Sequence, residues 1–189
     1  MDLHVHFKNF NFLRLILMLC AFMLLASCAH IRRDGPPDFY VDETKIPNAV
    51  PTYQPISKYG NMPSYVVKGH RYYVLRSSRG YNRVGIASWY GTLFHRKLTS
   101  DHERYNMLGM TAASCTLPLP TYVLVTNLHN HRKVIVKVND RGPFRRDRLI
   151  DLSYVAAKKL HMLGRGTALV RVQAIDVYAY YHHRNYLYG

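Results

Sequence analysis

The sequence predicts a mainly β domain, a small barrel with one or two short helices, behind a secretion signal. Short runs rich in Val, Ile and Tyr recur along residues 65–178, a length typical of one domain. Two of these runs, 134–138 and 169–175, alternate apolar and polar residues as strands with one buried face do. No long helical pattern separates the runs, which disfavours a doubly wound sheet.

Residues 1–27 are typical of a lipoprotein signal peptide. Lys8 and Arg14 precede an apolar run, 15–26, which leads into Cys28. A dozen apolar residues are too few for a membrane span, which needs about 20. Small residues before a cysteine are typical of a lipobox, so we expect Cys28 to carry the lipid. An ordinary cysteine behind an ordinary signal is the alternative.

The residues after the signal favour the outer membrane. Cys28 is followed by Ala29 and not by the aspartate that tends to retain lipoproteins in the inner membrane. Two or more acyl chains anchor a protein stably, so we expect an outer-membrane lipoprotein facing the periplasm. Cys115 is then the one cysteine left over, which excludes an intramolecular disulfide. No cysteine-protease signature surrounds it, which favours a small buried side chain over a nucleophile.

Residues 28–64 are expected to form the lipid anchor and an extended linker. This stretch has little apolar periodicity and holds six of the nine prolines, a composition typical of a semi-extended tether. The barrel itself is expected over 65–178. A tail rich in Tyr and His, 179–189, follows, and could pack on the barrel or stack on sugars.

Five strands and one helix are predicted within the barrel. The strands are 72–75, 84–90, 122–127, 134–138 and 169–175, with a hairpin turn at 129–131. The helix follows Ser153 as N-cap, buries Ala156 and Leu160, and is expected to end at Gly164 as C-cap. A shorter helical turn is expected around 105–113.

Asp140 is the strongest candidate for chemistry from its position alone. It ends an apolar strand, begins a Gly-Pro turn and has Arg141 and Arg148 nearby. This arrangement places a carboxylate at the rim of a barrel. The alternative is that Asp140 only caps the turn and pairs with Arg141.

Five segments resemble the successive motifs of the rare lipoprotein A family, in order. They are Gly-Ile-Ala-Ser-Trp-Tyr-Gly at 85–91, Met-Thr-Ala-Ala at 110–113, Thr-Leu-Pro-Leu-Pro-Thr-Tyr at 116–122, Val-Asn-Asp-Arg-Gly-Pro-Phe at 138–144 and Ile-Asp-Leu-Ser-Tyr at 150–154. The resemblance implies a double-psi β-barrel and lytic transglycosylase activity on peptidoglycan strands that lack stem peptides. It implies no metal and no cofactor.

The same resemblance assigns roles to individual residues. Asp140 matches the catalytic aspartate and is expected to act as acid and base, while Glu103 matches a second carboxylate that assists it. The residues expected to bind substrate are Tyr90, Thr99, Ser100, Tyr105, Ser114 and Arg141.

Four positions depart from the family pattern. Ser114 stands where the family has histidine, Asn106 where it has aspartate, and Arg96 and His102 where it has glycines. Ser114 cannot carry a proton near pH 7 as an imidazole can. These departures keep an alternative open: a non-catalytic peptidoglycan-binding or division-associated lipoprotein with a degenerate site.

Charge adds a further expectation about partners. The formal net charge is +15, a sign that favours polyanions. Behind a lipobox the available anions are cell-wall carboxylates, lipid headgroups and phosphates, so we expect peptidoglycan and the outer membrane as partners, with cell-division proteins possible and nucleic acid excluded. A basic solvated surface without a specific partner is the alternative. No histidine or cysteine spacing predicts a zinc site.

Overall fold

The structure, a computed structural model, describes residues 34–182. The predicted signal peptide, the Cys28 anchor and most of the Tyr/His tail lie outside the described residues. The elements are η1 (Glu43–Lys45), β1 (Ser64–Val67), β2 (His70–Tyr73), β3 (Asn82–Tyr90), β4 (Thr111–Ala113), β5 (Thr121–Asn127), β6 (Lys133–Asp140), β7 (Ile150–Ser153), α2 (Tyr154–Lys159), β8 (Ala168–Ala174) and α3 (Val177–His182). None of the helices in this part of the chain has the length and hydropathy to span a bilayer.

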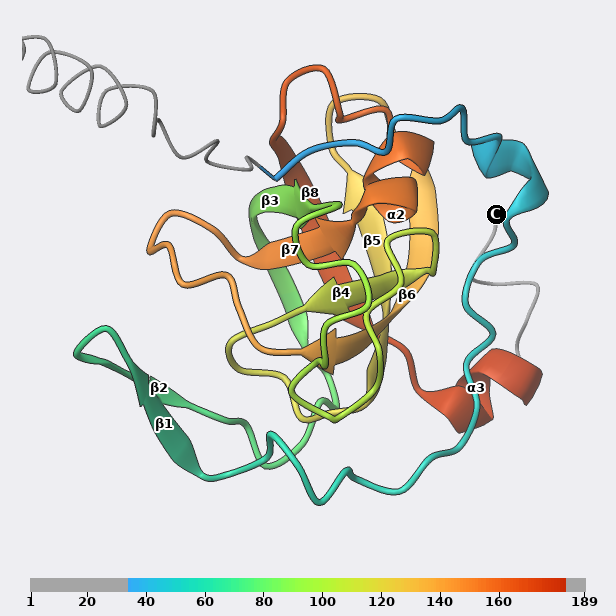
Figure 1. Cartoon of the computed structure of the whole chain (residues 1–189). Coiled ribbons are helices and arrows are strands. Elements are labelled where there is room, and N and C mark those ends of the chain that lie inside the picture. Colours follow the sequence, from blue (N-terminus) through green and yellow to red (C-terminus); the bar gives the residue numbers. More distant parts are fainter. Residues whose placement is uncertain (1–33, 183–189) are drawn as a thin grey trace, which may run out of the picture. The chain divides into compact units, whose positions relative to one another are not determined.

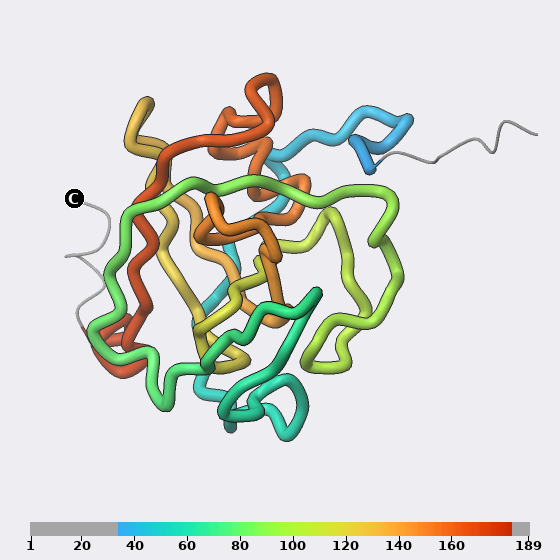
Figure 2. Tube along the Cα trace, turned by 90° about the vertical axis from the view of Figure 1, so that its left-hand side faces the viewer, coloured from blue at the N-terminus to red at the C-terminus, as the bar shows by residue number. Residues whose placement is uncertain are grey.

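Six strands close into a barrel in the order β3-β7-β4-β6-β5-β8 (Figure 1). The pairs β3–β7 and β4–β6 are parallel, and the remaining neighbours are antiparallel. Figure 2 shows β3 and β8 running side by side along one wall. The expectation of a mainly β barrel is therefore confirmed.

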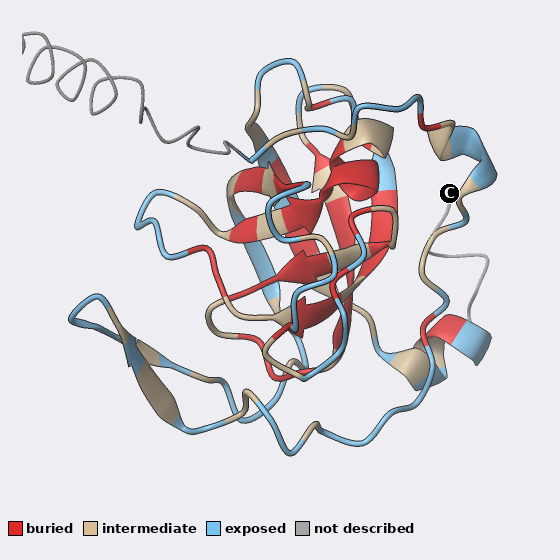
Figure 3. Ribbon diagram, viewed as in Figure 1, coloured by how far each residue is buried: buried red, intermediate tan, exposed pale blue. Residues whose placement is uncertain are grey.

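The core follows from the alternation that the sequence shows. On β6, Val134, Val136 and Val138 are at most 2% exposed, and on the paired strand β5 so are Val123 and Val125. Fully burying one such side chain stabilises the fold by about 1.5–3 kcal/mol. Figure 3 shows that burial is concentrated in the barrel strands and in α2, and the valines belong to one hydrophobic core cluster.

Three short strands were not predicted, and two predictions about helices were wrong. The segment around 105–113 was expected to be helical, but Thr111–Ala113 forms β4, which pairs with both β6 and β7. A three-residue strand is too short to show an alternation, so its state is decided by the neighbours that supply its hydrogen bonds. In α2, Ser153 is the N-cap as predicted, but the helix ends at Lys159 with Leu160 as its C-cap, so Gly164 does not have that role.

Residues 34–56, here called the strap, lie against the barrel (Figure 1). The carboxylate of Asp34 accepts from the amides of Gly91 and Leu93, each at 2.9 Å. Farther along, the amide of Ala49 donates to the carbonyl of Ile135 at 3.1 Å. From Asp34 onward these bonds attach the strap to the barrel, and the extended linker expected over 28–64 stays a prediction.

The hairpin of β1 and β2 projects from the barrel as a two-stranded ribbon (Figure 1). Its rings Tyr65 and Tyr72 stack with centroids 5.3 Å apart, and both contact the edge of Phe144. Phe144 follows β6 by four residues, so these aromatic contacts hold the base of the ribbon beside the end of β6.

Candidate functional site

The site forms where β6 ends beside β4. The register between these strands shifts, because Ala112 pairs with Val138 but Ala113 pairs with Asp140, which leaves Asn139 as an extra residue. Such a bulge redirects side chains and is common beside active sites. It places two polar residues, Asn139 and Asp140, in succession at the rim of the barrel.

Asp140 is fixed through one of its two carboxylate oxygens. Its Oδ1 accepts from the amide of Ser100 at 2.8 Å, the hydroxyl of Ser100 at 2.7 Å and the amide of Arg141 at 2.7 Å. No hydrogen bond from residues 34–182 reaches Oδ2. The carboxyl group is thus oriented by three donors and keeps one oxygen for a further partner.

The guanidinium of Arg141 turns away from Asp140. Its Nε donates to the carbonyl of Gly60 at 2.8 Å, and its Nη1 donates to the carbonyls of Ser114 at 3.0 Å and Leu117 at 2.5 Å. Burial lowers the pKa of the guanidinium relative to an exposed arginine. The alternative in which Asp140 only caps the turn includes a side-chain ion pair with Arg141, and this ion pair is not formed.

The second nearby arginine is also engaged elsewhere. Arg148 donates to the hydroxyl of Ser88 at 2.6 Å and lies 3.9 Å from Asp151. Burial raises the pKa of Asp151, while the bond from Ser88 and the charge of Arg148 oppose that rise. Neither arginine therefore clamps the carboxylate of Asp140.

Glu103 is held at the same end of β6 by two donors. Lys137 pairs with its Oε1, and the side-chain amide of Asn139 donates to its Oε2 at 2.8 Å. Burial acts to raise the pKa of Glu103, but the bonds from Lys137 and Asn139 outweigh it, and the pKa is lowered. The group is therefore ionised at neutral pH.

One loop links the two carboxylates, since Ser100 holds Asp140 and Glu103 lies three residues later. The loop closes on itself, because the amide of Thr99 donates to the carbonyl of Glu103 at 2.8 Å. At its two flanks Arg96 and His102 both have φ of +68°, a conformation that favours glycine. The chain keeps the left-handed turns at both positions despite the side chains.

Four of the predicted substrate-binding residues are buried. Tyr90, Thr99, Tyr105 and Ser114 are at most 7% exposed. The hydroxyl of Tyr105 donates to the carbonyl of Tyr90 at 2.6 Å, and their rings stack at 4.1 Å. The hydroxyl of Ser114 accepts from the amide of Leu117 at 3.3 Å, within a turn. These four residues support the site from inside, and their direct contact with a substrate stays a prediction.

The other two, Ser100 and Arg141, line a groove of about 490 Å³. Its walls include Tyr59, Tyr65 and Phe144, of which Tyr59 is 38% and Phe144 42% exposed. Exposed ring faces suit the apolar faces of sugars. None of these three aromatic residues was predicted to belong to the site, although Phe144 is the last residue of the motif at 138–144.

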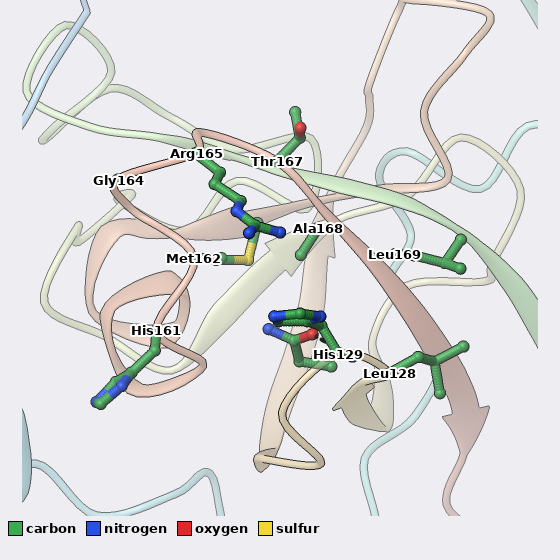
Figure 4. Close-up of a pocket in the computed structure, with 10 residues that line it drawn as sticks. Leu128, His129, His161, Met162, Gly164, Arg165, Thr167, Ala168 and Leu169 are labelled. Carbon is green, nitrogen blue, oxygen red and sulfur yellow. Dashed lines mark hydrogen bonds between the residues drawn. The ribbon is translucent and has the colours of Figure 1, made fainter.

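A larger cavity, of about 570 Å³, lies at the C-terminal end of β5, where Asn127 lines it (Figure 4). The side chains of Arg165 and His129 lie near Met162 there, and no carboxylate lines it. It therefore lacks the acid–base groups that the rim of β6 provides. Among the described residues, no cluster of three or more His, Cys, Asp or Glu side chains could hold a metal ion.

Comparisons with known proteins show what the chain is similar to. A family model described as "Lytic transglycolase" matches residues 82–172, which span most of the barrel. The protein "Endolytic peptidoglycan transglycosylase RlpA" of Pseudomonas aeruginosa is 54% identical over 144 residues, 76% of this chain and 42% of that protein. Its namesake in Vibrio cholerae is 42% identical over 170 residues, 87% of this chain and 64% of that protein. The chain thus spans about two fifths to two thirds of the length of these relatives. A solved structure of the Streptomyces papain inhibitor aligns with a TM-score of 0.42 at 20% identity, over 51% of this chain and 96% of that chain.

Proposed function

The chain belongs to the rare lipoprotein A family, with its double-psi β-barrel, and from that premise we propose that it is an endolytic peptidoglycan transglycosylase. We propose that it acts on glycan strands without stem peptides. The observation that carries the proposal is Asp140: three donors fix one carboxylate oxygen, and the other is left for a substrate beside an aromatic groove.

The proposed reaction uses one carboxyl group twice. Asp140, protonated on its free Oδ2, donates that proton to the oxygen that bridges N-acetylmuramic acid and N-acetylglucosamine, and the bond from this oxygen to the muramoyl C1 breaks. The resulting carboxylate then takes the proton of the muramoyl C6 hydroxyl while its oxygen bonds to C1. The product ends in a 1,6-anhydro ring, and Asp140 regains its proton.

Glu103 stabilises the positive charge that develops on the sugar. Both of its oxygens accept from neighbours and its pKa is lowered, so it does not donate a proton near neutrality. An anion fixed at the rim stabilises an oxocarbenium-like transition state. This division gives the two carboxylates different roles through their environments.

Mass spectrometry of denuded glycan strands after incubation with the protein tests the proposal. We expect 1,6-anhydromuramoyl ends, and we expect Asp140→Asn to reduce the cleavage rate by at least about 1,000-fold, as loss of an acid–base group does. Asp147→Asn is the matched control, because that carboxylate is exposed and pairs with Arg145. If the wild-type protein binds strands without cleaving them while the Pseudomonas relative cleaves them, the non-catalytic alternative is correct.

The lipid anchor also belongs to the proposal. The small residues before Cys28 and the alanine after it support an outer-membrane lipoprotein that faces the periplasm. Membrane fractionation of cells that express the protein or its Cys28→Ser variant tests this placement. We expect the protein in the outer-membrane fraction and the variant outside it. Association with cell-division proteins stays a prediction, which co-purification from dividing cells would check.

A further inference from the structure

The groove beside Asp140 combines aromatic rings with positive charge. Its lining residues include the cations Lys58 and Arg141, and none of the lining side chains is acidic. The guanidinium of Arg141 is already bonded to carbonyl groups. Lys58 is exposed and forms no ion pair with any residue in the range 34–182. The groove thus offers one uncommitted amine next to its rings.

Lys58 and His102 meet at the ring of Tyr59. The rings of Tyr59 and His102 stack with centroids 3.7 Å apart and planes 2° apart, and Nζ of Lys58 lies 4.9 Å from the centroid of Tyr59. Cations favour such positions over aromatic rings. Lys58, Tyr59 and His102 therefore form one cationic aromatic wall of the groove, here called the Tyr59 wall.

The backbone holds this wall in place. His102 has a φ of +68°, an unfavourable conformation for a residue with a Cβ, and such outliers cluster at ligand sites. On the other side, the amide of Ser57 donates to the carbonyl of Leu119 at 2.8 Å, and the side chain of Asn61 donates to the same carbonyl at 2.8 Å. The segment that bears Tyr59 is fixed at both ends, so its ring is preorganised.

The substrate class of the proposed function supplies a matching anion. A stem peptide is joined by an amide to the lactyl group of muramic acid, so its hydrolytic removal leaves a free carboxylate on each muramoyl residue. We propose that the Tyr59 wall stacks on a muramoyl ring and that Lys58 pairs with this lactyl carboxylate, so that the groove selects strands without stem peptides. This inference rests on the proposed function and assigns its specificity to named side chains.

Binding measurements in the non-cleaving Asp140→Asn background test the inference, with denuded strands and the same strands after methyl esterification as probes. Lys58→Gln is expected to weaken binding of denuded strands about three- to fivefold, typical of an exposed ion pair, and to leave binding of esterified strands unchanged. Tyr59→Ala is expected to weaken binding of both probes about three- to tenfold. Lys45→Gln and Tyr40→Ala are the matched controls, since both side chains are exposed and lie on the strap outside the groove.

Two results would overturn the inference. One is that the Lys58→Gln protein and its parent bind denuded strands with equal affinity. The other is that Lys58→Gln weakens the binding of denuded and of esterified strands by the same factor. Melting curves of each variant would show that the fold is retained. Failure of the proposed function would give a different result from failure of this inference. The wild-type protein would then bind strands with the expected selectivity but yield no anhydro products.

Discussion

Arg141 was expected to bind substrate, but the structure makes it a link between segments that are distant in sequence. Its guanidinium donates to Gly60, to Ser114 and to Leu117, so it joins segment 57–61 to the turn after β4. Ser114 and Leu117 are at most 2% exposed, which leaves their carbonyls no access to water once the donor is removed. We therefore predict that Arg141→Gln destabilises the fold.

The magnitude follows from the two buried carbonyls. Each buried polar group left without its partner costs about 1–3 kcal/mol, so the free energy of unfolding should fall by about 2–6 kcal/mol. For a domain of this size, each kcal/mol lowers Tm by about 2–4 °C. Arg141→Lys keeps the charge but lacks the planar fork, and we expect about half of the loss.

Urea denaturation followed by circular dichroism measures this change. Arg145→Gln is the control, because that side chain is 66% exposed and its loss should change stability by less than about 0.5 kcal/mol. If Arg141→Gln unfolds at the wild-type urea concentration but no longer binds glycan, the structural role assigned to Arg141 is refuted.

Three further changes have defined outcomes. The pKa of Glu103 is lowered in the folded protein, so its ionised form stabilises the fold above the unfolded pKa, and this stability is lost as the pH falls through the folded pKa. The Glu103→Gln protein should therefore lack this loss of stability below about pH 4.5. The difference should be less than about 1 kcal/mol because the side chain is so exposed, and urea titrations at several pH values would measure it. In Gly91→Ala the new Cβ would lie 2.0 Å from the carbonyl oxygen of Gly35, so the strap must shift, and urea denaturation should show a loss of about 1–3 kcal/mol. Ser100→Ala removes the 2.7 Å hydroxyl bond to Asp140 but keeps the amide bond, so steady-state kinetics should show kcat about tenfold lower with little change in KM; an unchanged kcat would contradict the role of this bond.

The long strands could be predicted because each carries its own signal. The predicted runs 84–90, 122–127, 134–138 and 169–175 correspond closely to β3, β5, β6 and β8. In contrast, β4 and β7 have three and four residues, and their hydrogen bonds come from strands far away in the sequence. No local pattern contains that information. The strap was similarly missed, because its attachment depends on backbone amides of the barrel that no composition indicates.

The site shows the same difference between features with a local sequence signal and features that depend on distant segments. Asp140 could be proposed because its Asp-Arg-Gly-Pro-Phe motif is intact, and Glu103 could be proposed although Arg96 and His102 replace glycines around it. The roles of both carboxylates stay predictions. The orientation of the Arg141 side chain could not be predicted, because most of its hydrogen-bond acceptors are backbone carbonyls, which every residue has. Tyr90 lies within the motif at 85–91 and Tyr105 lies two residues after Glu103, but neither position predicts that the two rings stack and are buried. Proximity in sequence to a site does not determine which side chains face the solvent.

Closure of the barrel also limits how this protein can associate with other chains. A closed sheet leaves no strand edge with unpaired amides, and such edges are where proteins form intermolecular sheets and aggregate. Within the described residues, the open edges belong to β1 and β2, which are four residues long and include the exposed, basic Arg71 and His70. Short, charged edges resist such pairing. Among the described residues, the ribbon of β1 and β2 therefore offers only short edges for the formation of intermolecular sheets.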